Sequence, residues 1–254
     1  MAYSSIAKPT DYFNTVTYTG NGGTNALTGV GFQPDFIWTK ARSYNDDHLL
    51  VNSVTGNTAY LKSNSNGANS SSSIRVTSFN SDGFTLGSSS DINGNTDTYV
   101  GWSWLGGGSA SSNSDGSITS SVSANTTAGF SIVTYTGTGS AASVGHGLGV
   151  KPDIIFSKLY STTGDWNVYH DSFSAQERIK LNSTAAKSSN SSIFASLPTS
   201  SVVNIGTGGD INTSSGTHLF YCFTSKTGYS KFGSYVGNGN ADGPFIYTGF
   251  KPAF

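Results

Sequence analysis

Charge is scarce in this chain of 254 residues. Asp, Glu, Lys and Arg make up 11% of it and the net charge is −1, whereas charged residues form roughly 25% of an average soluble protein. The 13 basic residues are spread out, with no cluster beyond short pairs such as Lys40/Arg42. Neutralising a phosphate backbone needs a concentrated basic face, so we predict no nucleic-acid binding.

Cysteine and long apolar runs are also lacking. The single cysteine, Cys222, excludes a disulfide within the chain, and its place in an apolar stretch predicts an inert buried thiol. No apolar run reaches the roughly 18 residues of a membrane helix, and residues 1–9 lack the charged-then-apolar plan of a signal peptide. We therefore expect no membrane insertion. We expect the protein to be synthesised in the cytoplasm.

Good helix formers are few, and Glu177 is the only glutamate. Thr, Val, Tyr and Phe instead recur between turns rich in glycine, which predicts an all-β fold. The only stretch that we expect to approach a helix is a turn at residues 173–177.

The chain repeats itself. Residues 91–104 match residues 210–223 without a gap, both stretches open with Asp-Ile-Asn, and the pair Trp102/Trp104 reappears as Tyr221/Phe223. An aromatic residue at every second position places both rings on one face of a strand. Each copy therefore predicts a turn followed by a core strand.

Two further motifs recur three times. A strand-like stretch ending in Tyr-x-Gly occurs at 13–20 and 130–137 and, weakened, at 232–239; each is followed by a Gly-x-x-Pro marker whose prolines are Pro34, Pro152 and Pro252. From the glycine of the first motif to the proline is 14, 15 and 15 residues. Spacing this steady predicts two copies of one unit and the start of a third.

We therefore predict two tandem antiparallel β-sandwich domains of jelly-roll or lectin-like type. The expected order is an N-terminal arm (1–10), a first repeat (11–106), a Gly/Ser-rich linker (107–126), a second repeat (127–227) and a partial third repeat (228–254). The last segment, with its apolar residues 245–247, is expected to add a strand to the second repeat or to a neighbouring subunit; continuation of the protein beyond it is the other alternative.

One stretch resembles a calcium loop, because oxygen ligands alternate at Asp91, Asn93, Asn95 and Asp97. The second copy keeps the first two of these positions but has Ser214 and Gly216 at the others. A turn in which Asx side chains bond the local backbone explains better what both copies share. We predict no metal and no cofactor, with the calcium loop as the weaker alternative.

No catalytic pattern accompanies the titratable residues. The histidines occupy unrelated positions in the two repeats and lack any nucleophile motif: they are His48, His146, His170 and His218. We predict that the chain is not an enzyme.

Sugar binding is the alternative that the residues support best. A Trp, a Tyr, a His and an Asp come together at Asp165, Trp166, Tyr169 and His170, and an exposed ring flanked by polar groups can stack on a sugar. Packing of Trp166 in the core is the competing interpretation. Trp38, Trp102 and Trp104 have aromatic counterparts in the second repeat, which favours the core for them.

Several long motifs carry a resemblance to a known family. They are residues 8–15, 31–40, 78–87, 128–137 and 229–235. They resemble the tandem-repeat, lectin-like β-sandwich virion proteins of tailed phages, especially marine ones, over nearly the whole chain. The resemblance implies a non-enzymatic structural component of the particle, at a tail fibre, tail appendage or capsid surface, located in the virion after synthesis in the host cytoplasm.

The expected partners are further copies of the chain, in a homo-oligomer that we expect to be a trimer, and other virion proteins. The alternative function is a host-receptor lectin module of a tail fibre that binds a surface glycan.

Overall fold

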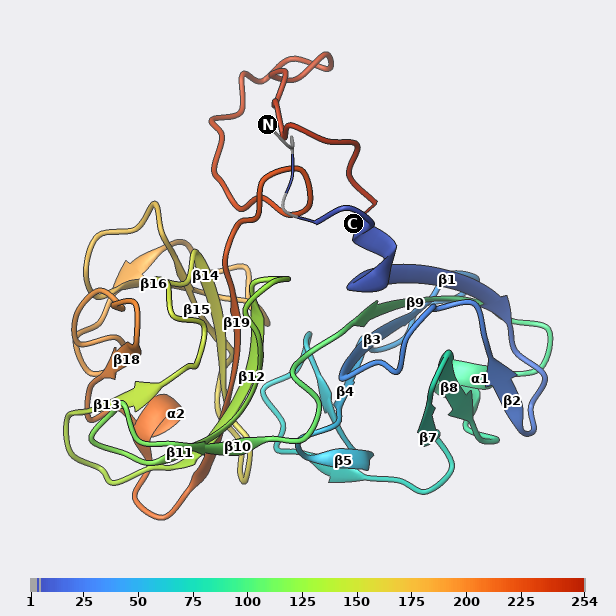
Figure 1. The fold of residues 1–254 in the computed structure, drawn as a ribbon, viewed down its shortest axis with the longest axis horizontal. Coiled ribbons are helices and arrows are strands. Elements are labelled where there is room, and N and C mark those ends of the chain that lie inside the picture. The colour runs from blue at the N-terminus through green and yellow to red at the C-terminus, as the bar shows by residue number, and fades with distance from the viewer. Residues whose placement is uncertain (1–3, 5, 254) are drawn as a thin grey trace.

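The computed structural model describes residue 4 and residues 6–253, and strands dominate it (Figure 1). Every ladder between named strands is antiparallel, so the predicted all-β class is confirmed. The helical elements of the described residues are short: η1 (Pro9–Asp11), α1 (Ser90–Asn93) and α2 (Gly209–Asn212). None of these helices has the length or the apolar character needed to cross a membrane. The expected turn at 173–177 is non-helical, and the helical turns lie at the two Asp-Ile-Asn motifs instead.

The first half of the chain forms a six-stranded sheet and a three-stranded sheet. The six-stranded sheet runs in the order β1 (Phe13–Thr19), β9 (Thr98–Trp104), β3 (Phe36–Ala41), β4 (Leu49–Asn52), β5 (Gly56–Lys62) and β6 (Ser70–Ser71). The three-stranded sheet consists of β2 (Asn25–Leu27), β8 (Gly83–Leu86) and β7 (Val76–Asn80). One apolar cluster joins the two sheets, with Ile37, Val51, Phe84 and Leu86 among its buried members.

The second half repeats this plan with an eight-stranded and a two-stranded sheet. The larger runs in the order β10 (Ser111–Asn113), β11 (Ser120–Asn125), β12 (Phe130–Thr136), β19 (Thr217–Phe223), β14 (Ile154–Leu159), β15 (Asn167–His170), β16 (Glu177–Lys180) and β17 (Ser188–Ser189). The smaller pairs β13 (Ala142–Gly145) with β18 (Val202–Ile205). Their shared cluster includes Val133, Ile155, Val203 and Phe220.

A third apolar cluster lies between the two larger sheets, and we call it the central layer. Its buried members come from both halves: Phe36, Leu50, Leu61 and Trp104 from the first, and Phe130, Ile132, Trp166, Leu219, Tyr221 and Phe223 from the second. Side chains alternate between the faces of a strand, so Ile37 faces the core of its own half while Phe36 faces the other half. The larger sheets are therefore covered on both faces.

The repeats in sequence make the same local contacts in both halves. Tyr18 Oη donates to the carbonyl of Ile92 at 2.8 Å, and Tyr135 Oη donates to that of Ile211 at 2.5 Å. The amide N–H groups of Asp35 and Asp153, which follow the two marker prolines, donate to the last residues of β9 and β19 at 2.9 and 2.8 Å. The matched motifs thus fold alike.

The predicted linker at 107–126 is not a plain connector, because it contributes two strands to the eight-stranded sheet. β10 and β11 lie within it, and β11 pairs with β12 from Ser121↔Thr134 onward. β11 is rich in serine, and buried serine hydroxyls replace the usual apolar alternation. Ser120 Oγ donates to Gly145 O at 2.8 Å, and Ser123 Oγ donates to Gly108 O at 2.7 Å.

Among the described residues, the C-terminal segment does not add a strand to the second repeat; its pairing with a neighbouring subunit stays a prediction. The described residues from 231 to 253 contain no strand, and the only bridge nearby joins Lys226 to Ser230. In Figure 1 this red segment forms a loop that projects beyond both lobes of the molecule. Of the predicted N-terminal arm, residues 1–3 and 5 lie outside the described residues, and residues 9–10 belong to η1.

Candidate functional site

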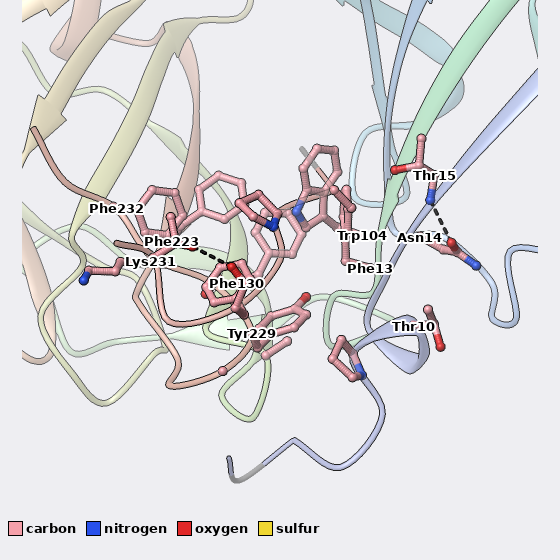
Figure 2. A pocket seen from close by; sticks show the side chains of 18 of the residues that line it. Thr10, Phe13, Asn14, Thr15, Trp104, Phe130, Phe223, Tyr229, Lys231 and Phe232 are labelled. Carbon is pink, nitrogen blue, oxygen red and sulfur yellow. Dashed lines mark hydrogen bonds between the residues drawn. The ribbon is translucent and has the colours of Figure 1, made fainter. Parts of the chain in front are cut away.

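The main cavity of the described residues opens where the central layer meets the terminal segments. It encloses about 780 Å³, within the usual range for ligand pockets. Rings from both larger sheets line it: Phe13, Trp38 and Trp104 from the first half, and Phe130, Phe156 and Phe223 from the second. Figure 2 shows how Phe13, Trp104, Phe130 and Phe223 converge. The terminal segments close it through residues 9–10, 228–232 and 248–253.

Strand register explains why these rings meet. Phe13 and Phe36 both pair with Trp104, from β1 and β3 on either side of β9. The ring centroids lie 4.8 and 5.0 Å from that of Trp104. Across the layer, Trp104 contacts Phe223 at 6.2 Å, edge to face. Such pairs stabilise a structure by roughly 0.5–1.5 kcal/mol each in addition to the effect of the area that they bury. These contacts therefore stabilise the wall of the cavity.

The start of the C-terminal segment is fastened to this wall. The ring of Phe232 lies 5.7 Å from that of Phe223, and the ring of Tyr229 lies 6.3 Å from that of Tyr12. Ser230 Oγ donates to Thr224 O at 3.3 Å. Burial raises the pKa of Tyr229 well above its ordinary value. Residues 229–232 therefore close one side of the cavity, and the chain then continues into the projecting loop.

The lining is apolar, with a few polar groups of defined kind. The charged residues that line it are lysines, Lys231 and Lys251. Lys231 Nζ donates to Tyr247 O at 3.2 Å. Thr15 Oγ1 is buried and has no hydrogen-bond partner among the described residues. The arrangement suits an apolar or aromatic group; the lining brings together no pair of groups for acid–base chemistry.

The structure contradicts the sugar site predicted at Asp165, Trp166, Tyr169 and His170. Trp166 is fully buried, its Nε1 donates to Lys62 O at 2.9 Å, and its ring stacks on Tyr221. Tyr169 is 1% exposed and packs on Phe194. Neither ring can receive a sugar.

The polar members of that set have separate partners. Asp165 pairs with Lys180 at 2.5 Å, and this contact lowers the pKa of the carboxyl. His170 Nδ1 lies 2.8 Å from Ser172 Oγ. The competing interpretation of Trp166, packing in a core, is the correct one, but the core is the central layer between the halves.

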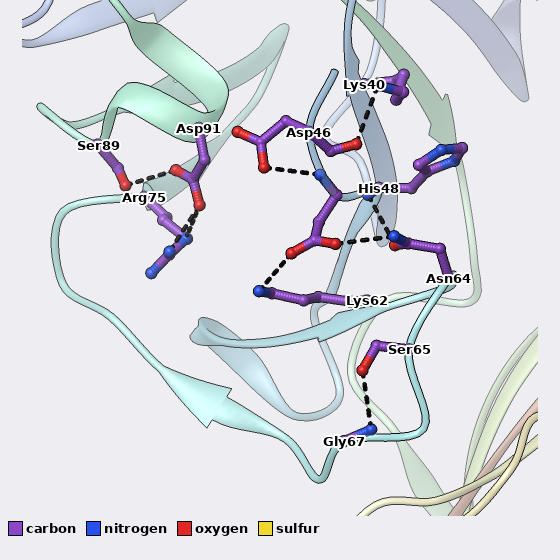
Figure 3. Close-up of polar contacts among 11 residues, drawn as sticks. Lys40, Asp46, His48, Lys62, Asn64, Ser65, Gly67, Arg75, Ser89 and Asp91 are labelled. Atoms are coloured by element: carbon purple, nitrogen blue, oxygen red, sulfur yellow. Dashed lines mark hydrogen bonds and ion pairs between the residues drawn. The ribbon is translucent and has the colours of Figure 1, made fainter. Parts of the chain in front are cut away.

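The weaker calcium alternative at Asp91, Asn93, Asn95 and Asp97 does not form a ligand sphere either. Asp91 accepts from Arg75 at 2.6 Å and from Ser89 at 2.5 Å (Figure 3). Asn93 points into the protein and bonds the backbone, Asn95 is exposed, and Asp97 accepts from Ser43 Oγ at 3.0 Å. The four side chains are directed to different partners, as expected of a turn.

The histidines and the cysteine are dispersed. His146 and His218 are buried, which lowers the pKa of both, that of His218 to about 4. Cys222 is fully buried and its pKa is raised to about 12. The prediction of a buried, inert thiol is confirmed.

Sequence reasoning missed two groups that hold the halves together. Asn52 Nδ2 donates to Tyr221 Oη at 2.9 Å across the central layer. Lys158 is fully buried, and its Nζ donates to the carbonyls of Asn66, Leu159 and Gly164 at 3.2, 2.9 and 2.9 Å. Burial lowers the pKa of Lys158 to about 8. No sequence pattern marks Lys158 as a contact to the first half.

The fold and the cavity define an all-β protein whose two halves enclose an aromatic layer. A family model described as a domain of unknown function, DUF7483, matches residues 8–254, and the chain belongs to this family. No curated protein and no solved structure matches the chain.

Proposed function

We propose that this protein is a non-enzymatic structural component of a phage particle that acts as a homo-oligomer at the tail or the capsid surface. The observation that carries the proposal is the apolar C-terminal segment. The consecutive residues Phe245, Ile246 and Tyr247 are 89%, 49% and 68% exposed. Contiguous exposed apolar surface of this kind marks contact with another chain. The resemblance of the repeated motifs to phage virion proteins supplies the context.

The charged side chains support a structural role, because they are engaged in holding loops. Asp91 with Arg75, Asp47 with Lys62 and Glu177 with Lys187 form ion pairs within the same half. Asp82 accepts from the N–H groups of Gly29 and Gly31, which lowers the pKa of its carboxyl. Groups committed in this way are poorly placed to act on a substrate.

Location on the particle tests this proposal most directly. Immunogold labelling or a particle reconstruction should place the chain on the tail or the capsid surface, and light scattering of the purified protein should give a multiple of the chain mass, with three copies expected. Absence of the chain from purified particles would overturn the structural role. Turnover of a host polysaccharide by the purified protein would overturn the non-enzymatic one.

Glycan binding is a second candidate, favoured by the aromatic lining of the cavity beside the polar side chains of Asn14 and Thr15. A glycan array should then give a signal that Trp38→Ala abolishes, because Trp38 lines the cavity and is half-buried. Phe245→Ala, an exposed ring outside the cavity lining, is the matched control and should keep the signal. No signal from the wild type on host polysaccharides would remove this candidate.

A further inference from the structure

β1 is the longest of the outermost strands in the two larger sheets. Among residues 4 and 6–253, β9 is its only strand neighbour. The other outermost strands of the two larger sheets are short: β6 and β17 have two residues each and β10 has three, whereas β1 has seven. β1 also carries no charge and no proline and pairs with β9 without a bulge. Such an edge lacks the usual protection against pairing with another strand.

The register identifies which groups point outward. Tyr12 O accepts from Leu105 N, and Gly20 N donates to Asp97 O, so the even-numbered residues between them bond β9 and the odd-numbered residues face away. Thr15 N–H is taken by Asn14 Oδ1 at 2.9 Å, and Thr19 O accepts from Asn25 Nδ2 at 3.4 Å. Between these side-chain contacts, the N–H and C=O of Thr17 meet no partner in the described part of the chain.

The second half shows what belongs at this edge. β12 is the counterpart of β1, and its outer side carries β11, with Thr134, the counterpart of Thr17, paired with Ser121. The corresponding position beside β1 carries no strand of the described residues. The repeat therefore defines a strand site in the first half.

The C-terminal segment has the properties of the missing strand. Residues 244–248 read Pro-Phe-Ile-Tyr-Thr and pair with no strand of the described chain. Pro244 lacks an N–H and suits a strand start. Alternation places Phe245 and Tyr247 on one face and Ile246 on the other. If the segment lay beside β1, Phe245 and Tyr247 would cover the cavity side of the sheet, and Ile246 would cover its core side.

A second copy is the natural source of this strand. The segment is held at both ends within its own chain, because Phe232 packs on Phe223 and Phe250 lines the cavity. Between these points, residues 233–247 form the projecting loop of Figure 1. From these observations we propose that residues 244–248 of one copy add a strand to the outer edge of β1 in the next copy.

This inference rests on the proposed homo-oligomer and specifies its interface. Each copy has one donor segment and one acceptor edge, so the contact is head-to-tail and closes into a ring if the rotation between copies allows it. A trimer is such a ring.

The test uses the full chain, with sedimentation or light scattering as the readout. Thr17→Pro removes an outward N–H and spares the ladder to β9, and Ile246→Asp places a charge in the donor. Both should weaken assembly at least tenfold. The matched controls are Thr17→Val, which keeps the N–H, and Tyr235→Asp, which charges the other arm of the loop; both should assemble as the wild type does.

A disulfide experiment tests the contact itself. Thr17→Cys and Phe245→Cys copies, whose new side chains lie on the same face of the sheet, should give a covalent dimer when mixed and oxidised that neither gives alone. If the oligomer persists unchanged in Thr17→Pro and Ile246→Asp, the strand site is wrong although the homo-oligomer stands. A wild type that stays monomeric at its highest soluble concentration would overturn the homo-oligomer and the inference together.

Discussion

At the scale of single residues, burial decides what a side chain can do. His218 and Tyr99 occupy equivalent positions, and each ring stacks on a tyrosine: His218 on Tyr135 at 5.1 Å and Tyr99 on Tyr18 at 5.2 Å. A histidine ring can take up a proton near neutral pH, whereas the ring of a tyrosine cannot. Burial opposes that proton and lowers the pKa of His218 to about 4.

This difference predicts that the protein loses stability in mild acid and that a single substitution reduces this loss. Below about pH 6.5 the unfolded chain binds a proton at His218 and the folded chain does not until about pH 4, so stability falls as the pH falls through this window. His218→Tyr, which copies the first half, should reduce the loss of unfolding free energy between pH 6.5 and 5 by on the order of 1–2 kcal/mol. Urea unfolding at the two pH values measures it.

His146 also has a lowered pKa, so some acid sensitivity should remain in the variant. His170→Gln serves as the control, because His170 is only partly buried. The explanation would be wrong if His218→Tyr had the same slope as the wild type over this range.

At the scale of elements, one asparagine in each half ties a helical turn to the loop after the first strand. Asn93 Nδ2 donates to Gly87 O and Gly23 O, both at 2.7 Å, and Asn93 Oδ1 accepts from Asn21 N at 3.1 Å. Asn212 makes the corresponding bonds in the second half, to Gly206 O at 2.8 Å and Ser140 O at 2.6 Å. Only a side chain with both a donor and an acceptor satisfies this site.

Asn93→Asp should therefore destabilise the protein by about 3 kcal/mol, since it removes the donor and sets a buried carboxylate against two carbonyls. Asn95→Asp, at an exposed position of the same turn, should be nearly neutral. Thermal unfolding of both variants, with and without added calcium, is the measurement. A calcium loop would behave in the opposite way: the extra carboxylate at position 93 would raise the melting temperature when calcium is added.

The strands of this fold were predictable where alternation and repetition act together. The aromatic pairs Trp102/Trp104 and Tyr221/Phe223 do lie on one face of β9 and β19, and the motifs after the marker prolines do form strands. β11 was not predicted because a strand rich in serine, whose buried hydroxyls bond carbonyls outside its own sheet, has no apolar period. The helical turns were not predicted because four residues are too few for a helical pattern.

The site was less predictable, for a related reason. Phe36, Ile37 and Trp38 are consecutive apolar residues, which is typical of a strand covered on both faces. This pattern indicates two apolar layers but does not say that the second layer is the other half of the same chain. Trp166 has no counterpart in the first half, so the repeat could not reveal that it belongs to the central layer.

At the scale of the whole molecule, the central layer makes the two halves one unit. Hydrogen bonds between the halves surround this layer. Trp166 Nε1 donates to Lys62 O, Asn52 Nδ2 donates to Tyr221 Oη, and Lys158 Nζ donates to Asn66 O. Backbone bonds add to these, from Asn69 N to Tyr160 O and from Gly164 N to Asn66 O, both at 2.9 Å. Separation of the halves would expose the aromatic layer and leave these buried groups unpaired, so we expect the halves to unfold together.

Calorimetry should then show one transition whose calorimetric and van't Hoff enthalpies agree. Trp166→Ala removes the largest buried side chain of the layer and should cost about 3–5 kcal/mol. Because Trp166 bonds Lys62 of the first half, this variant should also weaken the coupling and broaden or split the transition. Tyr235→Ala, which removes a ring that is 68% exposed, should unfold as the wild type does. Two well-separated transitions in the wild type would mean that the halves are independent and that the central layer contributes little to their stability.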